Sequence, residues 1–456
     1  MMKRVLIISF SFPPASGSGV LRTLKFVKYL PTFNWVPIVL SVREKYANKI
    51  DKELLNEIPK STVIFRTIMS DPLAWILDTR NKIKLFLKKN SDKSNKPYNP
   101  KKPVEEISSN KNSVQKLFTD WLSFPDRTIG WVPWALFRGI TIIRKYNPQI
   151  IYSTSPPASA HIIGYYLKRY TKKPWIIDFR DPWDVEYLSR NKSNWRIKSE
   201  LKLRNRILLS ADRIIANTEA LRDKICLSNP SIDKKNIVVI PNGFDPDDFK
   251  NINLKPRINN NECIISHIGE LYPDGRKPDQ FLIAISELIK ETRLPKDSLK
   301  VYFIGDRDIT PTNEFKSLVE NLGLKDVVIV KDHISHIKSI EHLFYSDILL
   351  LLQTGKNFNL QIPAKVYEYI AAKKPILALT PDGETARFVK QYPLGIVVNP
   401  EDIQRIKYEI QNLLQKKGFP PQNNLDEFVS KYDRKKHTEY FANILNTLIK
   451  SDAQKN

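Results

Sequence analysis

The sequence predicts an α/β protein of two doubly wound, Rossmann-like domains that face a cleft. Its 456 residues are too many for one ordinary core. Short apolar, β-branched runs alternate with helical patterns, which is typical of parallel strands buried on both faces. This rhythm restarts after Gly243, and two such series in one chain predict two sheets.

The elements follow one another in a regular order. The strands expected in the first series are residues 4–10, 36–42, 149–154, 175–179, 213–217 and 237–243, with a helix over 20–30 after the first strand. The strands expected in the second series are residues 263–269, 301–305, 327–330, 347–353, 375–379 and 395–398, with a helix over 279–291. Doubly wound sheets bind ligands at the carboxyl ends of their strands, so the residues after each strand are the candidates for function.

The polar, proline-containing stretch 242–262 separates the two series. We therefore expect an N-terminal domain over 1–243, a C-terminal domain over 244–424, and a final helix within 425–456 that packs back across the boundary. Residues 81–112 hold nine Lys and three acidic residues and interrupt the rhythm as a flexible, basic insertion. The segments on either side mix Trp, Leu and Phe with Lys, which fits interfacial helices on anionic lipid and equally ordinary amphipathic helices.

The net charge of +24 predicts an anionic partner: nucleic acid, an anionic membrane or a phosphorylated substrate. No nucleic-acid-binding motif supports the first of these, and we expect no nucleic-acid partner. Cys226 and Cys263 have neither metal-ligand spacing nor a disulfide pattern, which fits a reducing cytoplasm. No run reaches the roughly 18–20 apolar residues of a membrane span. The apolar run 5–10 is interpreted as a first strand rather than as an export signal.

The first strand ends in "SFSFPPASGSG", and Gly17, Ser18 and Gly19 directly precede a helix. A glycine-rich turn lets backbone N–H groups approach an anion, and the N-terminus of a helix adds positive potential. The same residues also fit a plain strand-to-helix turn.

Two further strand ends in the first domain carry polar side chains. "STSPPASAH" ends in Ser155 and His161, and "WIIDFRDPWD" contains Asp178, Arg180 and Asp181. Carboxylates and hydroxyls at strand ends would bind the hydroxyls of a sugar acceptor. The alternatives are a packed histidine and a structural ion-pair network.

The second domain gathers cations at its strand ends. "HIGELYPDGRKPDQ" places Arg276 and Lys277 before a helix, and Gly269 allows close approach of a ligand. "IPAKVYEYIAAKKPILAL" places Lys365 and Glu368 at the start of a short helix. Cations at helix N-termini are unfavourable unless an anion is bound, so these residues predict a diphosphate site.

Taken in order, "PPASGSG", "ADRIIANTEALRDKI", "IPNGFD", "ISHIGELYPDGRKP" and "IPAKVYEYIAAKKPILAL" resemble family 4 of the retaining GT-B glycosyltransferases, in a branch that acts in surface-polysaccharide assembly. The resemblance implies metal-independent transfer of a sugar, with no cofactor, from a nucleotide sugar, for which we expect a UDP-sugar. It implies that Arg276 and Lys365 hold the diphosphate as the catalytic cations. It also implies that Glu368 binds the ribose as the second Glu of the family's E-x7-E element.

The other donor-binding residues that we expect are Gly269, Lys277, Gly17, Ser18 and Gly19. The acceptor-binding residues that we expect are Ser155, His161, Asp178, Arg180 and Asp181. The chain departs from the family pattern at Leu360, where the first Glu of E-x7-E should stand. The contact with the donor sugar's hydroxyls thus has no assigned residue, although the loop 354–362 is where donor selectivity is expected.

The leading hypothesis is transfer to a lipid-linked or polysaccharide acceptor in cell-surface glycan synthesis, by a cytoplasmic protein peripheral on the inner face of the membrane. A nucleotide-sugar epimerase on the same fold and a non-catalytic nucleotide-sugar-binding homologue, suggested by Leu360, remain as alternatives. The first would need acids and bases facing one another, and the second would bind nucleotide without transfer.

Overall fold

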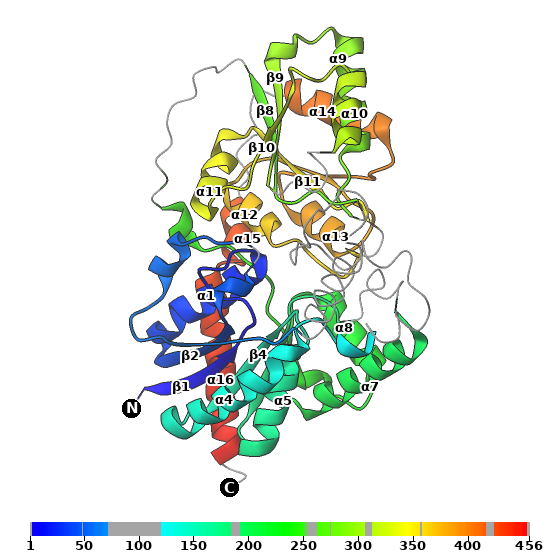
Figure 1. Ribbon diagram of the computed structural model, residues 1–456. Coiled ribbons are helices and arrows are strands. Elements are labelled where there is room, and N and C mark those ends of the chain that lie inside the picture. The colour runs from blue at the N-terminus through cyan, green and yellow to red at the C-terminus, as the bar shows by residue number, and fades with distance from the viewer. Residues whose placement is uncertain are drawn as a thin grey trace, which may run out of the picture. The chain divides into compact units, whose positions relative to one another are not determined.

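The computed structural model describes residues 2–47, 49–71, 120–183, 192–250, 252, 262–273, 275–305, 312–355, 358–415 and 424–453 (Figure 1). The chain divides into two compact units. The N-terminal unit comprises Met1–Ala216, Arg222–Val239 and Phe441–Asn456, and the C-terminal unit comprises Asn217–Leu221 and Ile240–Tyr440. The insertion expected at 81–112 lies outside the described residues.

The N-terminal unit is built on a parallel sheet with the strand order β3-β2-β1-β4-β5-β6-β7. Its strands are β1 Lys3–Ile8, β2 Trp35–Val42, β3 Val63–Thr67, β4 Ile150–Ser155, β5 Trp175–Phe179, β6 Arg213–Ala216 and β7 Ile237–Val239. The central strands are buried on both faces, which explains their unbroken apolar sequences. Edge strand β3 was not predicted, because it is only half-buried and its sequence VIFRT includes a charged residue.

Helices cover this sheet between successive strands. They are α1 Ser18–Tyr29, α4 Val132–Tyr146, α5 Ser159–Thr171, α7 Asn194–Ser210 and α8 Glu219–Ser228. Helices α4 and α5 lie side by side (Figure 1). Gly139 of α4 permits this close packing, because a Cβ there would lie 2.7 Å from Cδ1 of Leu167 on α5.

The C-terminal unit is built on a second parallel sheet with the order β10-β9-β8-β11-β12-β13. Its strands are β8 Cys263–Ile268, β9 Leu299–Ile304, β10 Val328–Lys331, β11 Ile348–Leu352, β12 Ile376–Leu379 and β13 Gly395–Val398. Its helices are α9 Asp279–Thr292, α10 Asn313–Asn321, α11 His336–Tyr345, α12 Lys365–Ala371, α13 Glu384–Gln391, α14 Ile403–Gln415 and α15 Leu425–Ser430. Two doubly wound sheets are the predicted fold class, which is thus confirmed.

The single final helix expected within 425–456 is two helices, α15 and α16 Arg434–Ala453. The break occurs because the backbone of residues 432–434 pairs with Phe244 instead. Phe244 N donates to Tyr432 O at 3.0 Å, and Arg434 N donates to Phe244 O at 2.9 Å. The second part of α16 belongs to the N-terminal unit, where Phe441 lies 4.8 Å from the ring of Phe26.

Each sheet has one point at which the strand order reverses direction. In the N-terminal unit this point lies between β1 and β4, and in the C-terminal unit it lies between β8 and β11. Ligands of doubly wound sheets bind outside the carboxyl ends of such strands. The glycine turn at Gly17–Gly19 and the glycine at Gly269 both follow a strand at such a point. Among the described residues, no helix is long and apolar enough to cross a bilayer.

Candidate functional site

Gly269 directly follows β8 and is held in a backbone conformation that favours glycine, with φ of 138°. Its missing side chain makes room for cations. A Cβ at this position would lie 1.6 Å from Nζ of Lys365 and 3.9 Å from Nη1 of Arg276. Three residues that the sequence singled out separately are therefore brought together at one strand end.

Arg276 is positioned by the loop between β8 and α9. Its backbone N–H donates to Tyr272 O at 3.0 Å, and its guanidinium lies 5.1 Å from the centre of the Tyr272 ring. Lys277 is exposed, and its backbone N–H donates to Oγ1 of Thr354 at 3.2 Å. Because Thr354 follows β11, this bond ties the arginine loop to the second strand of the reversal point.

Helix α12 begins with Lys365 and carries Glu368 in its first turn, as predicted. The hydroxyl of Tyr369, on the same helix, accepts a hydrogen bond from the backbone N–H of Ile268 at 3.0 Å. Burial raises the pKa of the Tyr369 hydroxyl, which stays neutral. This bond fixes α12 against the end of β8 and so holds Lys365 beside Gly269.

His267 lies beneath this cluster and is fully buried. Its pKa is held well below the ordinary value, first by burial and then by the charges of Lys365 and Arg276. Nδ1 lies 3.0 Å from the carbonyl oxygen of Leu350, so this nitrogen carries the proton of the neutral ring. Burial and the closeness of the two cations thus both keep the His267 ring neutral.

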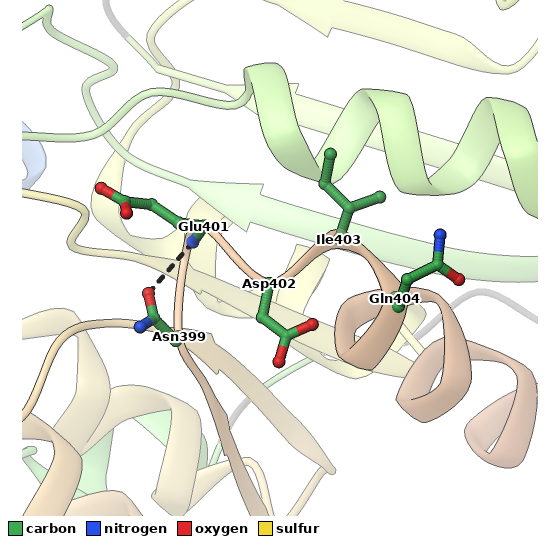
Figure 2. A pocket seen from close by; sticks show the side chains of 5 residues that line it. All are labelled: Asn399, Glu401, Asp402, Ile403 and Gln404. Atoms are coloured by element: carbon green, nitrogen blue, oxygen red, sulfur yellow. Dashed lines mark hydrogen bonds between the residues drawn. The ribbon is translucent and has the colours of Figure 1, made fainter.

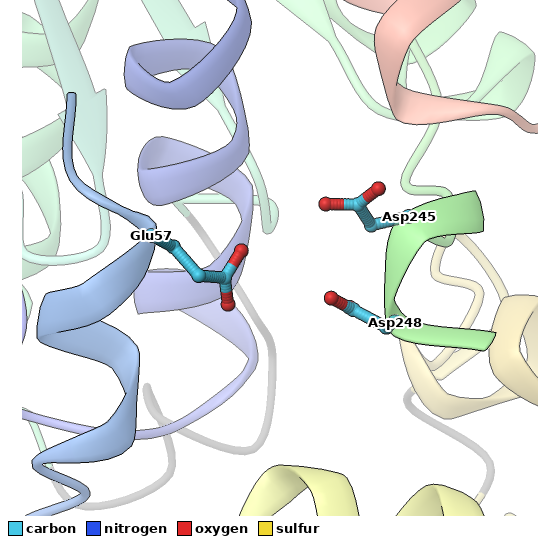
Figure 3. Close-up of side chains that lie close together, drawn as sticks. All are labelled: Glu57, Asp245 and Asp248. Carbon is cyan, nitrogen blue, oxygen red and sulfur yellow. The ribbon is translucent and has the colours of Figure 1, made fainter. Parts of the chain in front are cut away.

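Sequence reasoning missed a histidine that stands beside Glu368. Nδ1 of His336, the first residue of α11, lies 3.8 Å from Oε1 of Glu368. Its Nε2 lies 3.1 Å from Oδ2 of Asp248, which Figure 3 shows on the 3₁₀ helix η7, Pro246–Phe249. The three residues are 120 positions apart at most along the chain, and no local pattern marks them as partners.

Asp245 and Asp248 both project from the region of η7 (Figure 3). Asp245 caps η7, since its side chain accepts from the backbone N–H of Asp247 at 3.0 Å. The third carboxylate drawn there, Glu57, belongs to the N-terminal unit, where it accepts from Nζ of Lys25 at 2.6 Å. We assign no metal site to these groups.

Leu360, at the position where the family pattern has its first Glu, contributes a backbone contact. Its carbonyl oxygen accepts from Oγ1 of Thr218 at 2.8 Å. Next to it, Asn359 O accepts from the backbone N–H of Glu384 at 2.9 Å. The loop is thus tied to α13 and to residue 218 through its backbone, and Leu360 brings no carboxylate to the site.

In the N-terminal unit, Gly17 caps α1 with φ of 130°, and Gly19 lies in its first turn. A Cβ on Gly19 would lie 1.7 Å from Nη1 of Arg180, so the guanidinium rests on the glycine turn. Arg180 is half-buried, and its Nε donates to Ser155 O at 3.0 Å. The structure therefore brings together the glycine turn, Ser155 and Arg180. The side chain of Ser18 is outside the description.

Asp178 does not lie where an acceptor could reach it. It is fully buried, and its two oxygens accept from Arg22 on α1 at 3.0 and 2.9 Å. Oδ2 also accepts from the hydroxyls of Tyr152 at 2.5 Å and Thr154 at 3.2 Å. Burial alone would raise its pKa, but the Arg22 charge and these hydrogen bonds outweigh burial, and the pKa lies below the ordinary value. The structure supports the structural alternative for Asp178, and not acceptor binding.

His161 is likewise a packed residue. It is fully buried, with its ring 4.9 Å from that of Phe179, and its Nδ1 lies 2.8 Å from Oγ of Ser153. Burial lowers its pKa to about 3. An imidazole with no exposed surface does not contact an acceptor, so this expectation also lacks support. Ser155 is buried but offers its carbonyl to Arg180, while Asp181 is half-buried, and burial raises its pKa.

An open depression lies elsewhere on the C-terminal unit, at the start of α14 (Figure 2). It is lined by Asn399, Glu401, Asp402, Ile403 and Gln404. Asn399 Oδ1 accepts from the backbone N–H of Glu401 at 3.1 Å, and Asp402 Oδ1 accepts from the backbone N–H of Arg405. Two carboxylates and no basic side chain among these five residues would repel a diphosphate.

The arrangement in the C-terminal unit has a definite chemical capacity. Two cations converge on a glycine at the reversal point of a parallel sheet, and a carboxylate stands one helical turn away. Cations suit a diphosphate, and a carboxylate suits the hydroxyls of a ribose. In the N-terminal unit, a glycine turn and Arg180 lie at the corresponding strand ends.

Comparisons with known proteins point the same way. The family description "Glycosyltransferase Family 4" matches residues 99–248, and "Glycosyl transferases group 1" matches residues 248–435. No curated protein matches the sequence.

Solved structures share the fold over nearly the whole chain. A glycosyltransferase from Rickettsia africae is 19% identical with a TM-score of 0.61, and the match covers 98% of this chain and 99% of that one. Anabaena HepE in complex with UDP-glucose is 14% identical with a TM-score of 0.59, covering 97% and 99%. WaaG, a glycosyltransferase involved in lipopolysaccharide biosynthesis, is 12% identical with a TM-score of 0.55, covering 98% of each chain. At these identities the likeness shows the fold.

Proposed function

Since this chain belongs to family 4 of the retaining GT-B glycosyltransferases and uses a nucleotide-sugar donor, we propose that it transfers the sugar to a lipid-linked or polysaccharide acceptor in the synthesis of a cell-surface glycan. Both family descriptions are of glycosyl transferases, so the epimerase and the non-catalytic homologue lose their support.

The observation that carries the proposed site is the convergence of Lys365 and Arg276 on Gly269. We assign the donor diphosphate to this cluster. Lys365 stands at the start of α12, where a cation is unfavourable beside the helix dipole unless an anion is bound. Gly269 leaves the space in which the ammonium of Lys365 lies, and exposed Lys277 adds a third positive charge in the loop that follows the same strand.

The proposed chemistry follows from these charges. The bond between the anomeric carbon and the diphosphate oxygen breaks while the acceptor oxygen bonds to the same face of the sugar. The departing diphosphate takes the negative charge and accepts the acceptor's proton. Lys365 and Arg276 stabilise that charge more strongly in the transition state than in the bound donor, because the charge grows as the bond breaks.

Other roles follow from position. We assign the ribose hydroxyls to Glu368, which His336 and the Tyr369 anchor hold in place. In the N-terminal unit, we assign Gly17–Gly19 and Arg180 to binding the polar groups of the donor and the acceptor. Ser155 and Asp181 lie near them. Asp178 and His161 are buried in the core of the N-terminal unit and hold the surrounding strand ends in place.

A UDP-sugar is the donor that we propose, since a structural relative was solved with UDP-glucose. A glycan of the cell surface is the product that we propose, since another relative is involved in lipopolysaccharide biosynthesis. The net charge of +24 is in keeping with a phosphorylated donor and a diphosphate-linked lipid acceptor.

A thermal-shift measurement with UDP, GDP, ADP, CDP and dTDP tests the donor site. A nucleotide at about 100 times its dissociation constant stabilises the folded protein by about 2.7 kcal/mol. We expect UDP to raise the melting temperature of the wild type and to leave that of Lys365→Ala unchanged.

The matched control is Lys390→Ala, which removes an exposed cation of α13 in the same unit. This control should keep the full UDP shift. If UDP still raises the melting temperature of Lys365→Ala, the diphosphate does not bind at this cluster. A shift with another nucleotide that needs Lys365 would keep the site and change the donor. Transfer of radiolabelled sugar from that donor to a lipid extract then identifies the acceptor class.

A further inference from the structure

The outer face of α4 carries large aromatic side chains and cations. Phe137 is 76% exposed and Trp134 is 44% exposed. Arg138, Arg144 and Lys145 are exposed on the same helix. Trp134, Phe137 and Arg144 follow one another at intervals of three and seven residues, which places them on one stripe of the helix. The opposite stripe, which includes Ala135 and Ile142, packs into the core of the N-terminal unit.

Helix α5 continues this surface. Tyr166 and Tyr170 are exposed, and Nη2 of Arg144 donates to the hydroxyl of Tyr170. The Arg144 guanidinium also lies 5.8 Å from the centre of that ring. These contacts join the two outer faces. We name the surface formed by Trp134, Phe137, Arg144, Lys145, Tyr166 and Tyr170 the α4–α5 patch.

The charge of the two helices has one sign. Residues 132–146 and 159–171 contain five Lys and Arg and no Asp or Glu. Lys168 is neutralised by Asp212 at 2.6 Å. Within the described ranges, no carboxylate forms an ion pair with Arg138, Arg144, Lys145 or Arg169. The patch therefore presents a net positive field around exposed aromatic rings.

Single exposed apolar residues are normal on protein surfaces and need no function. Here several aromatic rings and unneutralised cations occur on two adjacent helices that lack acidic residues. Aromatic rings of this kind sit at the boundary between headgroups and acyl chains, while Lys and Arg attract anionic headgroups. Nucleic acid would use the same cations, but it gives no equal reason for the phenyl ring of Phe137 to be the most exposed aromatic side chain on either helix.

We propose that the α4–α5 patch docks this protein on an anionic lipid bilayer, with Phe137 and Trp134 inserted at the acyl boundary and Arg144 and Lys145 against the headgroups. The proposal deepens the proposed function, because a lipid-linked acceptor lies in such a bilayer. The docking itself depends only on the surface of the N-terminal unit. It is separate from the basic insertion expected at 81–112, which the structure does not describe.

Co-sedimentation of the full chain with vesicles tests the patch. Vesicles of phosphatidylcholine with added phosphatidylglycerol should bind the wild type, and phosphatidylcholine alone should bind it much less. Each basic side chain near an anionic surface contributes roughly fivefold to binding, so R144E combined with K145E should weaken it at least about 25-fold. Added salt should weaken binding of the wild type, because it screens the headgroups.

Phe137→Ser tests the apolar contribution to vesicle binding. We expect binding to weaken about tenfold, because the variant lacks the phenyl ring that leaves water in the wild type. Two matched controls keep the changes comparable. K290E with K316E changes the charge equally on exposed residues of α9 and α10 in the C-terminal unit. Leu227→Ser removes an apolar side chain that is 82% exposed on α8. Both controls should bind as the wild type does, and thermal melting should confirm that every variant is folded.

Three outcomes would overturn the proposal. They are no binding of the wild type to the anionic vesicles, equal losses in the patch and control variants, and unchanged binding of R144E/K145E. If R144E/K145E binds vesicles normally and loses binding to RNA, the patch is a nucleic-acid surface instead. Failure of the donor site is distinguishable: Lys365→Ala should bind vesicles normally, and R144E/K145E should keep the UDP-dependent thermal shift.

Discussion

Two clusters of charged residues, one at the strand ends of each sheet, use opposite arrangements of charge. In the N-terminal unit, the guanidinium of Arg22 is matched by the carboxylate of Asp178, and both side chains are buried. In the C-terminal unit, Lys365 and Arg276 converge on Gly269, a residue with no side chain at all. The first cluster encloses its arginine with a carboxylate, and the second gathers cations around a glycine.

The comparison shows what the charges of the two clusters can do. A buried pair with every oxygen hydrogen-bonded holds neighbouring segments in place, and here it joins α1 to the ends of β4 and β5. The two cations next to Gly269 carry like charges, which a bound anion would stabilise. We therefore interpret the Arg22–Asp178 pair as structural, and the cluster at Gly269 remains the donor site that we propose.

Removing one partner of the buried pair should have the largest effect. Asp178→Ala leaves the Arg22 guanidinium buried without its carboxylate, and we expect the free energy of unfolding to fall by about 3–5 kcal/mol. Urea denaturation followed by tryptophan fluorescence measures this change. The pair is a structural device if Arg22→Met combined with Asp178→Leu recovers most of the loss, because apolar residues of similar volume replace such pairs at little cost.

A small loss in Asp178→Ala would break the comparison, since it would mean that the carboxylate is not needed inside the unit. The UDP-dependent thermal shift should be unchanged in the double variant, because the donor site that we propose lies in the C-terminal unit.

Removing a cation from the cluster at Gly269 should slow the transfer reaction without changing the stability of the fold. We expect Arg276→Ala and Lys365→Ala each to lower the rate of transfer by on the order of 10²–10³, by analogy with lost oxyanion donors. Neither should lower the free energy of unfolding appreciably, since removing a cation from a cluster of like charges relieves repulsion. Radiolabelled sugar transfer and urea denaturation of the same preparations separate the two effects.

An Arg276→Lys variant sharpens this test. A lysine keeps the charge but has no fork of donors for two phosphate oxygens, so we expect an intermediate rate. If Arg276→Ala transfers as fast as the wild type, the departing diphosphate is not held by this arginine.

Much of the fold could be predicted because parallel strands that are buried on both faces need continuous apolar sequences. The break between α15 and α16 could not, because Phe244 pairs with residue 433 from 189 positions away. Edge strand β3 could not either, since half-burial leaves a weak pattern.

The site shows the same limit. The sequence indicated Gly269, Arg276 and Lys365 one by one, from glycine turns and helix starts, but their convergence exists only in space. The sequence left two interpretations of Asp178 open, because a carboxylate at a strand end resembles a ligand-binding residue. Its partner Arg22 lies 156 positions earlier, on the helix expected over 20–30.

The burial of His161 in the N-terminal unit can be tested through the pH dependence of stability. His161 has a pKa of about 3 in the folded protein, against about 6.5 in the unfolded chain. Because the unfolded state binds the proton more readily, stability is complete above the unfolded pKa and is lost as pH falls toward the folded pKa. Between about pH 7.5 and about pH 5, protonation of His161 in the unfolded state should lower the free energy of unfolding by about 2 kcal/mol.

The matched variant is His161→Gln, which stays neutral throughout this range. Comparison of urea denaturation at about pH 7.5 and about pH 5 should show a smaller fall for the variant than for the wild type. Equal falls in the two proteins would mean that His161 is not buried in the neutral form. The pKa of His267 is depressed in the wild type and in His161→Gln alike, so its contribution cancels when the two proteins are compared.

The smallest predicted effect concerns the histidine next to the open cluster. His336 is set between Asp248 and Glu368, so we expect it to position the Glu368 carboxylate for the donor and not to take part in bond breaking. His336→Ala should raise the KM for the donor about fivefold, the equivalent of about 1 kcal/mol, and leave kcat nearly unchanged. Steady-state kinetics with varied donor measure both constants.

Two conservative variants separate positioning from packing. His336→Asn places an amide nitrogen near the position of Nδ1, which faces Glu368, whereas His336→Gln reaches the position of Nε2, which faces Asp248. If His336 acts through Glu368, Asn should restore the KM and Gln should not. Equal restoration by both would reduce His336 to a packing residue. A fall in kcat with an unchanged KM would place it nearer the departing diphosphate, because a group that acts only in the transition state changes kcat alone.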